Sequence, residues 1–252
     1  MKKVIKKWYR LLDFPKSWEP DFDRLLQQKE LSPCTIDQYQ FDQDPQMDLI
    51  MYLYFCENLR NTYKQRQIPD EILYDTLSDL LIWAEVYYDV NGKIGLSEPS
   101  WLRRHLSGKL YKLGRLQFCI ADGEVEIHIP AVGPLLPAEC QQSIQRSKHF
   151  FATYFPDFQY DKYTCHSWLL DDTLLKFISK ESNIAQFANL FAVNHKEQSD
   201  AALKYIFRWD TRRDNLACFV PKTGFAAKIK DYVLGGGILY ESSGAFPLKN
   251  DL

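Results

Sequence analysis

The chain has 252 residues, of which 46% are hydrophobic and 25% charged, a composition typical of globular proteins that excludes disordered and fibrous classes. The formal net charge of −2 gives no overall basic field, so we expect no nucleic acid among its partners. The N-terminal segment lacks the apolar core of a signal peptide and the most apolar run, LIMYLYFC, is too short to cross a bilayer, so we expect a cytoplasmic protein with no membrane partner.

Over the first hundred residues, apolar side chains recur at helical spacing, with turn signals between the periodic runs. The Asn91-Gly92 pair ends the third predicted helix, which we expect to be a single one, and the fourth has Ser97 as its candidate N-cap. The predicted helices cover residues 22–30, 44–67, 69–91 and 97–106. This pattern predicts an all-helical N-terminal domain over residues 1–108.

After Gly108 the period changes from helical to alternating, which predicts a β-hairpin and a domain boundary at this point. Asp122-Gly123 forms the two-residue turn, and counting outward from it fixes the register. One face then holds three apolar pairs: Ile120 with Val125, Phe118 with Ile127, and Leu116 with Ile129. The other face pairs Gln117 with His128 and Cys119 with Glu126, and it places Arg115 diagonal to His128.

The remaining sequence mixes helical and extended segments, without an internal repeat. We expect helices over residues 136–156, 171–180, 199–209 and 221–237, an extended segment over 160–170, and a helical turn followed by a strand over 182–194. Asp171 is a candidate helix cap, and three glycines from Gly235 end the last helix. The whole chain is predicted to be α+β, with a mixed α/β domain over residues 109–252.

The polar face of the hairpin is the first candidate site. His128 is an acid/base group, and Gln117 beside it could fix its tautomer; Arg115 and Glu126 flank the pair. The alternative is a solvated outer face, which half-buried antiparallel hairpins have by default.

The cysteines and the adjacent Cys165 and His166 offer weaker chemistry. Neighbours on a strand point to opposite faces, so Cys165 and His166 do not form a catalytic dyad. The six cysteines form no pair or Cys/His group at zinc-finger spacing. We therefore expect reduced thiols and no bound metal.

Several segments in this order resemble a known bacterial family: GLSEPSWLRRHLSGKLYKLGRLQF, IHIPAVGPL, a helix ending FFATYFP, CHSWLLDDTLLKFI and SNIAQFANLF. The family comprises acyltransferase-domain proteins that join an N-terminal helical domain to a C-terminal domain similar to the GNAT superfamily. The resemblance runs from about Ile68 to near the C-terminus. It implies a GNAT-like mixed sheet and transfer of an acyl group from acyl-CoA, such as acetyl-CoA, to an amine of a small molecule or peptide.

Acyl transfer of this kind needs a base for the amine, donors for the oxyanion and an acid for the leaving thiolate. We assign His128 as base, Gln117 as polariser and Tyr163 as acid. Substrate-binding roles fall to Arg115, Ser167, Trp168 and Asn183.

Two alternatives stay open. The Q/R-x-x-G-x-G/A turn with which the superfamily binds the CoA pyrophosphate is not recognisable, which favours a non-catalytic protein that binds a small molecule or peptide on a degenerate GNAT-like fold. A scaffolding protein is the other alternative, and it requires an exposed apolar patch on the N-terminal helices and an obligate oligomer. The oligomeric state is left open.

Overall fold

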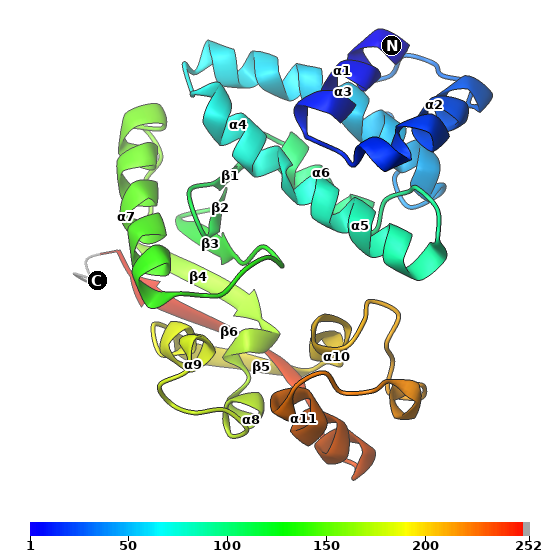
Figure 1. The fold of residues 1–252 in the computed structure, drawn as a ribbon. Helices are drawn as coiled ribbons and strands as arrows, with labels where there is room; N and C mark the ends of the chain where they lie inside the picture. Colours follow the sequence, from blue (N-terminus) through cyan, green and yellow to red (C-terminus); the bar gives the residue numbers. More distant parts are fainter. Residues whose placement is uncertain (249–252) are drawn as a thin grey trace. The chain divides into compact units, whose positions relative to one another are not determined.

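The computed structural model describes residues 1–248 and divides the chain into two compact units, Met1–Leu113 and a second that begins at Gly114 (Figure 1). An α+β fold is confirmed, with helices in the first unit and a mixed sheet with helices in the second. Our boundary after residue 108 remains a prediction about independently folding domains. Among the helices of residues 1–248, none combines the length and hydropathy required to span a bilayer.

The first unit is built around the buried helix α3 (Pro45–Gln65), on which α1 and α6 pack. Asp44 caps α3, since its carboxylate accepts hydrogen bonds from the backbone N–H groups of Gln46 and Met47. The other elements are α1 (Lys2–Leu11), α2 (Glu19–Gln28), α4 (Asp70–Leu77), α5 (Asp79–Asn91), α6 (Pro99–Leu106) and the short strand β1 (Leu110–Lys112).

The single helix predicted over residues 69–91 is wrong, because Ser78 separates α4 from α5. The Ser78 hydroxyl donates to the carbonyl of Asp75, and the Thr76 hydroxyl accepts from the backbone N–H of Lys112. The second contact involves a segment distant in sequence, so periodicity does not reveal it. Gly92 does end α5, in the left-handed conformation at φ 64°.

The N-cap predicted for α6 is also wrong. Glu98, not Ser97, precedes the helix, and it adopts a left-handed backbone conformation with φ 52°. At the other end of α6, the buried His105 Nε2 lies 3.1 Å from Asp79 Oδ2.

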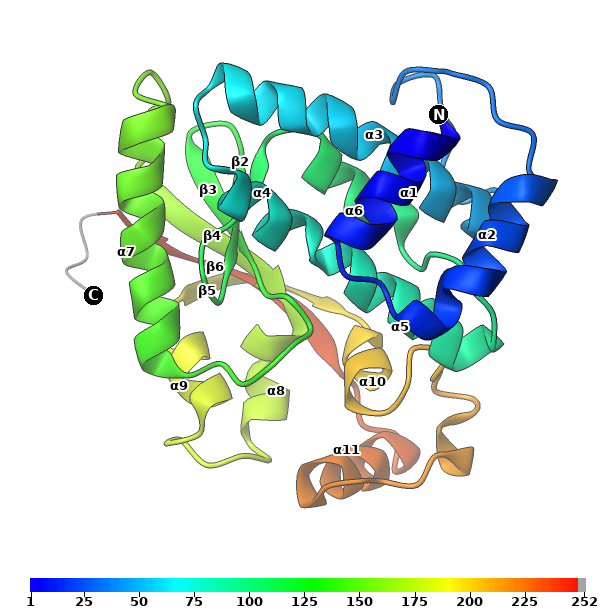
Figure 2. The same ribbon diagram turned by 45° about the horizontal axis from the view of Figure 1, so that its top comes forward.

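The second unit contains a mixed sheet whose strands lie in the order β2-β3-β4-β6-β5 (Figure 2). β2 and β3 are antiparallel, β3 and β4 are parallel, and β6 is antiparallel to both of its neighbours. The strands are β2 (Gln117–Ile120), β3 (Glu124–His128), β4 (Lys162–Ser167), β5 (Ala192–Gln198) and β6 (Tyr240–Pro247). The helices are α7 (Pro137–Tyr154), α8 (Asp172–Leu175), α9 (Asn183–Ala188), α10 (Ala201–Ile206) and α11 (Gly224–Leu234).

The predicted hairpin register is confirmed over the length of both strands. The Cα partners are Gln117 with His128, Phe118 with Ile127, Cys119 with Glu126 and Ile120 with Val125. Gly123 provides the turn at φ 70°, a conformation that favours glycine. Phe118, Val125 and Ile127 are fully buried on the apolar face, so the polar members lie on the opposite face.

Strand β6 was not predicted, although it lies between β4 and β5. Its sequence, YESSGAFP, is rich in the small and polar residues that are uncommon in strands. Gly244 allows close packing there, since a Cβ at this position would lie 2.9 Å from the Phe191 Cβ.

The predicted Asp171 cap is confirmed, with its carboxylate accepting from Thr173 N at 2.9 Å.

Candidate active site

The polar face of the hairpin carries the candidate site. Cys119 and Glu126 are opposite each other across the two strands, and Gln117 and His128 form the next pair on the same face. Gln117 is 1% and Cys119 7% exposed, whereas the side chains of His128 and Glu126 are 19% and 33% exposed. The face therefore joins two buried polar groups to two partly exposed side chains, although the Nε2 atom of His128 is itself buried.

His128 and Glu126 form an imidazole–carboxylate pair. The His128 Nε2 lies 3.3 Å from Glu126 Oε2, and the residues are two positions apart on one strand, so the backbone keeps them side by side. A neutral imidazole can accept a proton on its unprotonated nitrogen, and a carboxylate beside it can accept a hydrogen bond from the ring N–H. The pair is therefore equipped to accept a proton.

The same face of the sheet continues onto β4 and β6. Thr164 is the Cα partner of Glu126, and His166 follows two residues later on the same face. His166 Nδ1 lies 2.9 Å from the Ser243 hydroxyl, and its Nε2 lies 3.4 Å from Glu197 Oε1. Two histidines on adjacent parallel strands thus share one face.

Arg115 holds the loop that follows β3. Its guanidinium donates to the carbonyl oxygens of Pro134 at 2.8 Å, Gly133 at 3.1 Å and Pro130 at 3.3 Å. Burial lowers the pKa of this guanidinium from its ordinary value. With three donors committed to one loop, Arg115 fixes the backbone between His128 and α7.

Comparison with known families decides the class of protein. Residues 110–246 match the GNAT-like C-terminal domain, and residues 3–108 match the N-acyltransferase N-terminal domain. The chain belongs to this acyltransferase family. The family predicted from sequence is confirmed.

Solved structures of acyltransferases share its fold. One, in complex with CoA and 10C-teicoplanin, is 26% identical with a TM-score of 0.72, and the alignment covers 79% of this chain and 66% of that one. A variant acyltransferase in complex with octanoyl-CoA is 21% identical with a TM-score of 0.79, covering 98% and 88% of the two chains. A third, with decanoyl-CoA and teicoplanin, is 21% identical with a TM-score of 0.78, covering 96% and 87%. No curated protein matches the chain.

Tyr163 lies on the opposite face of the sheet from His128. It is the Cα partner of Val125 on the apolar face, is fully buried, and stacks on Phe246. The Ser147 hydroxyl donates to the Ile144 carbonyl at 2.7 Å, so the proton between Ser147 and Tyr163, 2.9 Å apart, belongs to Tyr163. Burial also raises the pKa of Tyr163. The structure therefore does not bring the predicted acid and the predicted base together.

Ser167 and Trp168 lie at the carboxyl end of β4. The Ser167 hydroxyl accepts from the backbone N–H of Leu169 at 3.2 Å and caps the turn that follows. Trp168 is partly buried and stacks on Tyr205 at a centroid distance of 5.7 Å. Asn183 is the first residue of α9, which Ser182 caps.

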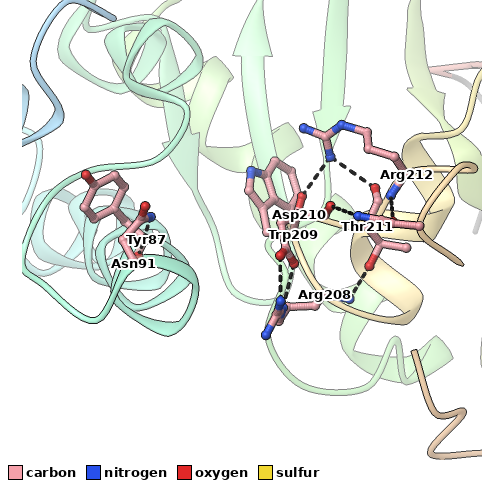
Figure 3. Close-up of polar contacts among 8 residues, drawn as sticks. Tyr87, Asn91, Arg208, Trp209, Asp210, Thr211 and Arg212 are labelled. Atoms are coloured by element: carbon pink, nitrogen blue, oxygen red, sulfur yellow. Dashed lines mark hydrogen bonds and ion pairs between the residues drawn. The ribbon is translucent and has the colours of Figure 1, made fainter. Parts of the chain in front are cut away.

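The segment after α10 extends the aromatic surroundings of Trp168. Tyr205 meets Trp209 edge-on at 5.3 Å. In the turn that follows, both Arg208–Asp210 contacts are 2.6 Å long, and Arg212 Nη1 donates to the carbonyl oxygens of Trp209 and Thr211 (Figure 3). These arginine donors stabilise the turn itself.

Sequence reasoning did not include His166 in the site. It rejected a Cys165–His166 dyad, and the structure agrees, since Cys165 is buried while His166 is exposed. Burial raises the pKa of the Cys165 thiol to about 12, which excludes a reactive thiolate near neutral pH. The alternation along β4 could have placed His166 on a polar face, but the identity of that face depends on pairing with β3.

Proposed function

We propose that the protein transfers an acyl group from acyl-CoA to an amine of a small molecule or peptide. The His128–Glu126 pair carries the proposal: it lies at the carboxyl end of β3, in a domain of an acyltransferase family. The amine of an acceptor is protonated in water, and a nearby base is needed before it can attack a thioester.

The parallel pair β3–β4, connected through α7, supports the acyl-CoA part. Ligands of α/β folds bind beyond the carboxyl ends of parallel strands, and helix N-termini there attract phosphates. Arg115 fixes the loop that leads to the N-terminus of α7, where no side chain within the described residues caps the helix. The solved relatives contain CoA, octanoyl-CoA and decanoyl-CoA, so we include acyl chains longer than acetyl.

The acceptor class is supported by the same relatives, two of which hold teicoplanin or a teicoplanin derivative. We propose a small molecule or peptide with a free amine. In the reaction, the neutral amine nitrogen attacks the thioester carbon while the His128 imidazole accepts the proton that the nitrogen loses. The carbon–nitrogen bond forms, the carbon–sulfur bond breaks, and the imidazolium returns its proton to the CoA thiolate. Gln117 beside His128 orients the reacting groups.

The first test is thermal stabilisation of the purified full chain by acetyl-, octanoyl- and decanoyl-CoA and by free CoA. A ligand at a hundred times its dissociation constant stabilises the folded state by about 2.7 kcal/mol, which is readily measured. We expect stabilisation by at least one acyl-CoA. Absence of stabilisation by every CoA species contradicts the proposal.

The second test uses matched histidine variants in an acyl-transfer assay that detects released CoA thiol over a panel of amines. His128→Gln keeps hydrogen-bonding capacity but removes the base, so we expect kcat to fall by about 10²-fold or more. His149→Gln is the control, since His149 is an exposed histidine on α7. Equal activity of the two variants would remove His128 from the mechanism.

A binding protein on a degenerate GNAT-like fold is the second candidate, favoured by the unrecognised pyrophosphate turn. It predicts stabilisation by an amine-bearing metabolite or peptide without turnover of any acyl-CoA. Acyl transfer in the assay above excludes it.

A further inference from the structure

We propose that Cys119, Glu126 and His128 form a binding site for a thiophilic divalent cation such as Zn²⁺, and that the cation occupies the lone pair His128 needs as a base. The second part rests on the proposed function. The ligand atoms, one from each side chain, all lie within 4.8 Å of one another. They offer one sulfur, one oxygen and one nitrogen, all from the hairpin.

The distances between the three ligand atoms are already close to those of tetrahedral coordination. Zinc bonds to nitrogen and oxygen are about 2.0–2.2 Å long, which puts two such ligands about 3.3 Å apart. His128 Nε2 and Glu126 Oε2 are separated by 3.3 Å. A thiolate at about 2.3 Å from the metal lies roughly 3.6 Å from the other ligands, so the sulfur has to move by roughly 1 Å at most. A small rotation of the Cys119 side chain provides this.

The backbone holds the three ligands on strands rather than on loops. Cys119 and Glu126 are direct cross-strand partners, and His128 follows Glu126 by two residues on the same face. One thiolate and one carboxylate balance the charge of a divalent cation, and a fourth position is left for water. Three protein ligands with an open position are typical of exchangeable or reactive zinc sites rather than closed structural ones.

The donor set selects the cation. Thiolate and imidazole ligands favour Zn²⁺, Co²⁺ and Cd²⁺ over Mg²⁺ and Ca²⁺, which prefer oxygen. Binding releases the proton of the Cys119 thiol as the sulfur–metal bond forms, so the affinity falls with decreasing pH. A neutral imidazole has one basic lone pair, so the metal–nitrogen bond leaves His128 no lone pair to accept the proton of an amine.

The experiment titrates the full chain with Co²⁺ and records the visible and near-ultraviolet spectrum. We expect one bound Co²⁺ with intense tetrahedral d–d absorption and a thiolate charge-transfer band, both lost on adding Zn²⁺ and unaffected by excess Mg²⁺. In Cys119→Ser the charge-transfer band disappears and affinity falls at least tenfold. Cys218→Ser, which removes an exposed thiol outside the site, behaves as wild type.

Glu126→Gln provides a second variant, at a partly exposed position, in case Cys119→Ser does not fold. We expect its Co²⁺ affinity to fall at least tenfold, because an amide oxygen carries no charge. A weak octahedral Co²⁺ spectrum would show that the proposed site does not exist. The same conclusion would follow from a thiolate band that persists in Cys119→Ser and disappears in Cys218→Ser. The inhibitory role is tested separately: Zn²⁺ should reduce acyl transfer and a chelator restore it. Without detectable acyl transfer, the Co²⁺ spectrum still decides whether the site exists.

Discussion

Replacing Tyr163 by Phe separates a structural role of its hydroxyl from the acid role that the sequence predicted. The ring remains in place, because it is fully buried and stacks on Phe246. Only the hydroxyl is lost, which bonds Ser147 at 2.9 Å and Tyr160 at 3.1 Å. A proton aimed at Ser147 is not available to a leaving thiolate on the other face of the sheet.

The expected cost follows from those two bonds. A neutral hydrogen bond contributes about 0.5–1.5 kcal/mol net, and Ser147 keeps its own bond to the Ile144 carbonyl. The exposed side of Tyr160 can replace its lost partner by water. We therefore expect Tyr163→Phe to lower the free energy of unfolding by about 1–2 kcal/mol, and the melting temperature by about 3–6 °C.

Two measurements test this prediction: urea unfolding for the free energy of unfolding, and acyl-transfer kinetics for kcat. Tyr160→Phe is the matched control, since it removes only one of the two bonds and should cost about half as much. We expect kcat of Tyr163→Phe to stay within about threefold of wild type at a temperature where both are folded, against the 10²-fold or more typical of losing a general acid. A loss of that size, with unchanged stability, would refute the reasoning and restore the acid role.

Two further predictions concern buried charged groups. Burial raises the pKa of Asp48 to about 6 from 3.8, so its stabilising effect is present at low pH and is lost as the pH rises through about 6. We expect the free energy of unfolding of the wild type, measured by urea titration relative to that of Asp48→Asn, to fall by about 2 kcal/mol between pH 4 and 7. A difference between the two proteins that does not change with pH contradicts this. Arg115→Lys replaces three separately placed nitrogen donors to loop 130–134 by a single ammonium, so we expect faster hydrogen exchange there and a higher KM for acyl-CoA with little change in kcat. Equal rises in exchange across the hairpin would indicate general destabilisation instead.

The features that sequence predicted correctly are set by local signals. The hairpin register follows from a two-residue turn and strict alternation, and both are contained in fifteen consecutive residues. The Asp171 cap is equally local, since it depends on a carboxylate two residues before an amide. These signals need no knowledge of the rest of the chain.

The features that were missed depend on pairing between distant segments. The break at Ser78 is accompanied by a bond from Lys112, and the strand β6 is defined by β4 and β5 rather than by its own small residues. The face on which Tyr163 lies is set by the parallel pairing of β3 and β4, across the whole of α7. A shift of one residue in that pairing would exchange Tyr163 and Thr164 between faces. Spacing along the sequence does not determine it.

The two proposals meet at one side chain. As a base, His128 needs the single basic lone pair of its neutral imidazole, and as a metal ligand it uses that same pair beside the Glu126 carboxylate. The arrangement that makes His128 a good base therefore also makes it a good ligand once a thiol lies opposite. What separates the roles is Cys119, because its thiol takes no part in proton transfer but supplies the third ligand of the metal. The hairpin thus places a cation site on the reactive nitrogen, and free Zn²⁺ and acceptor amine compete for it.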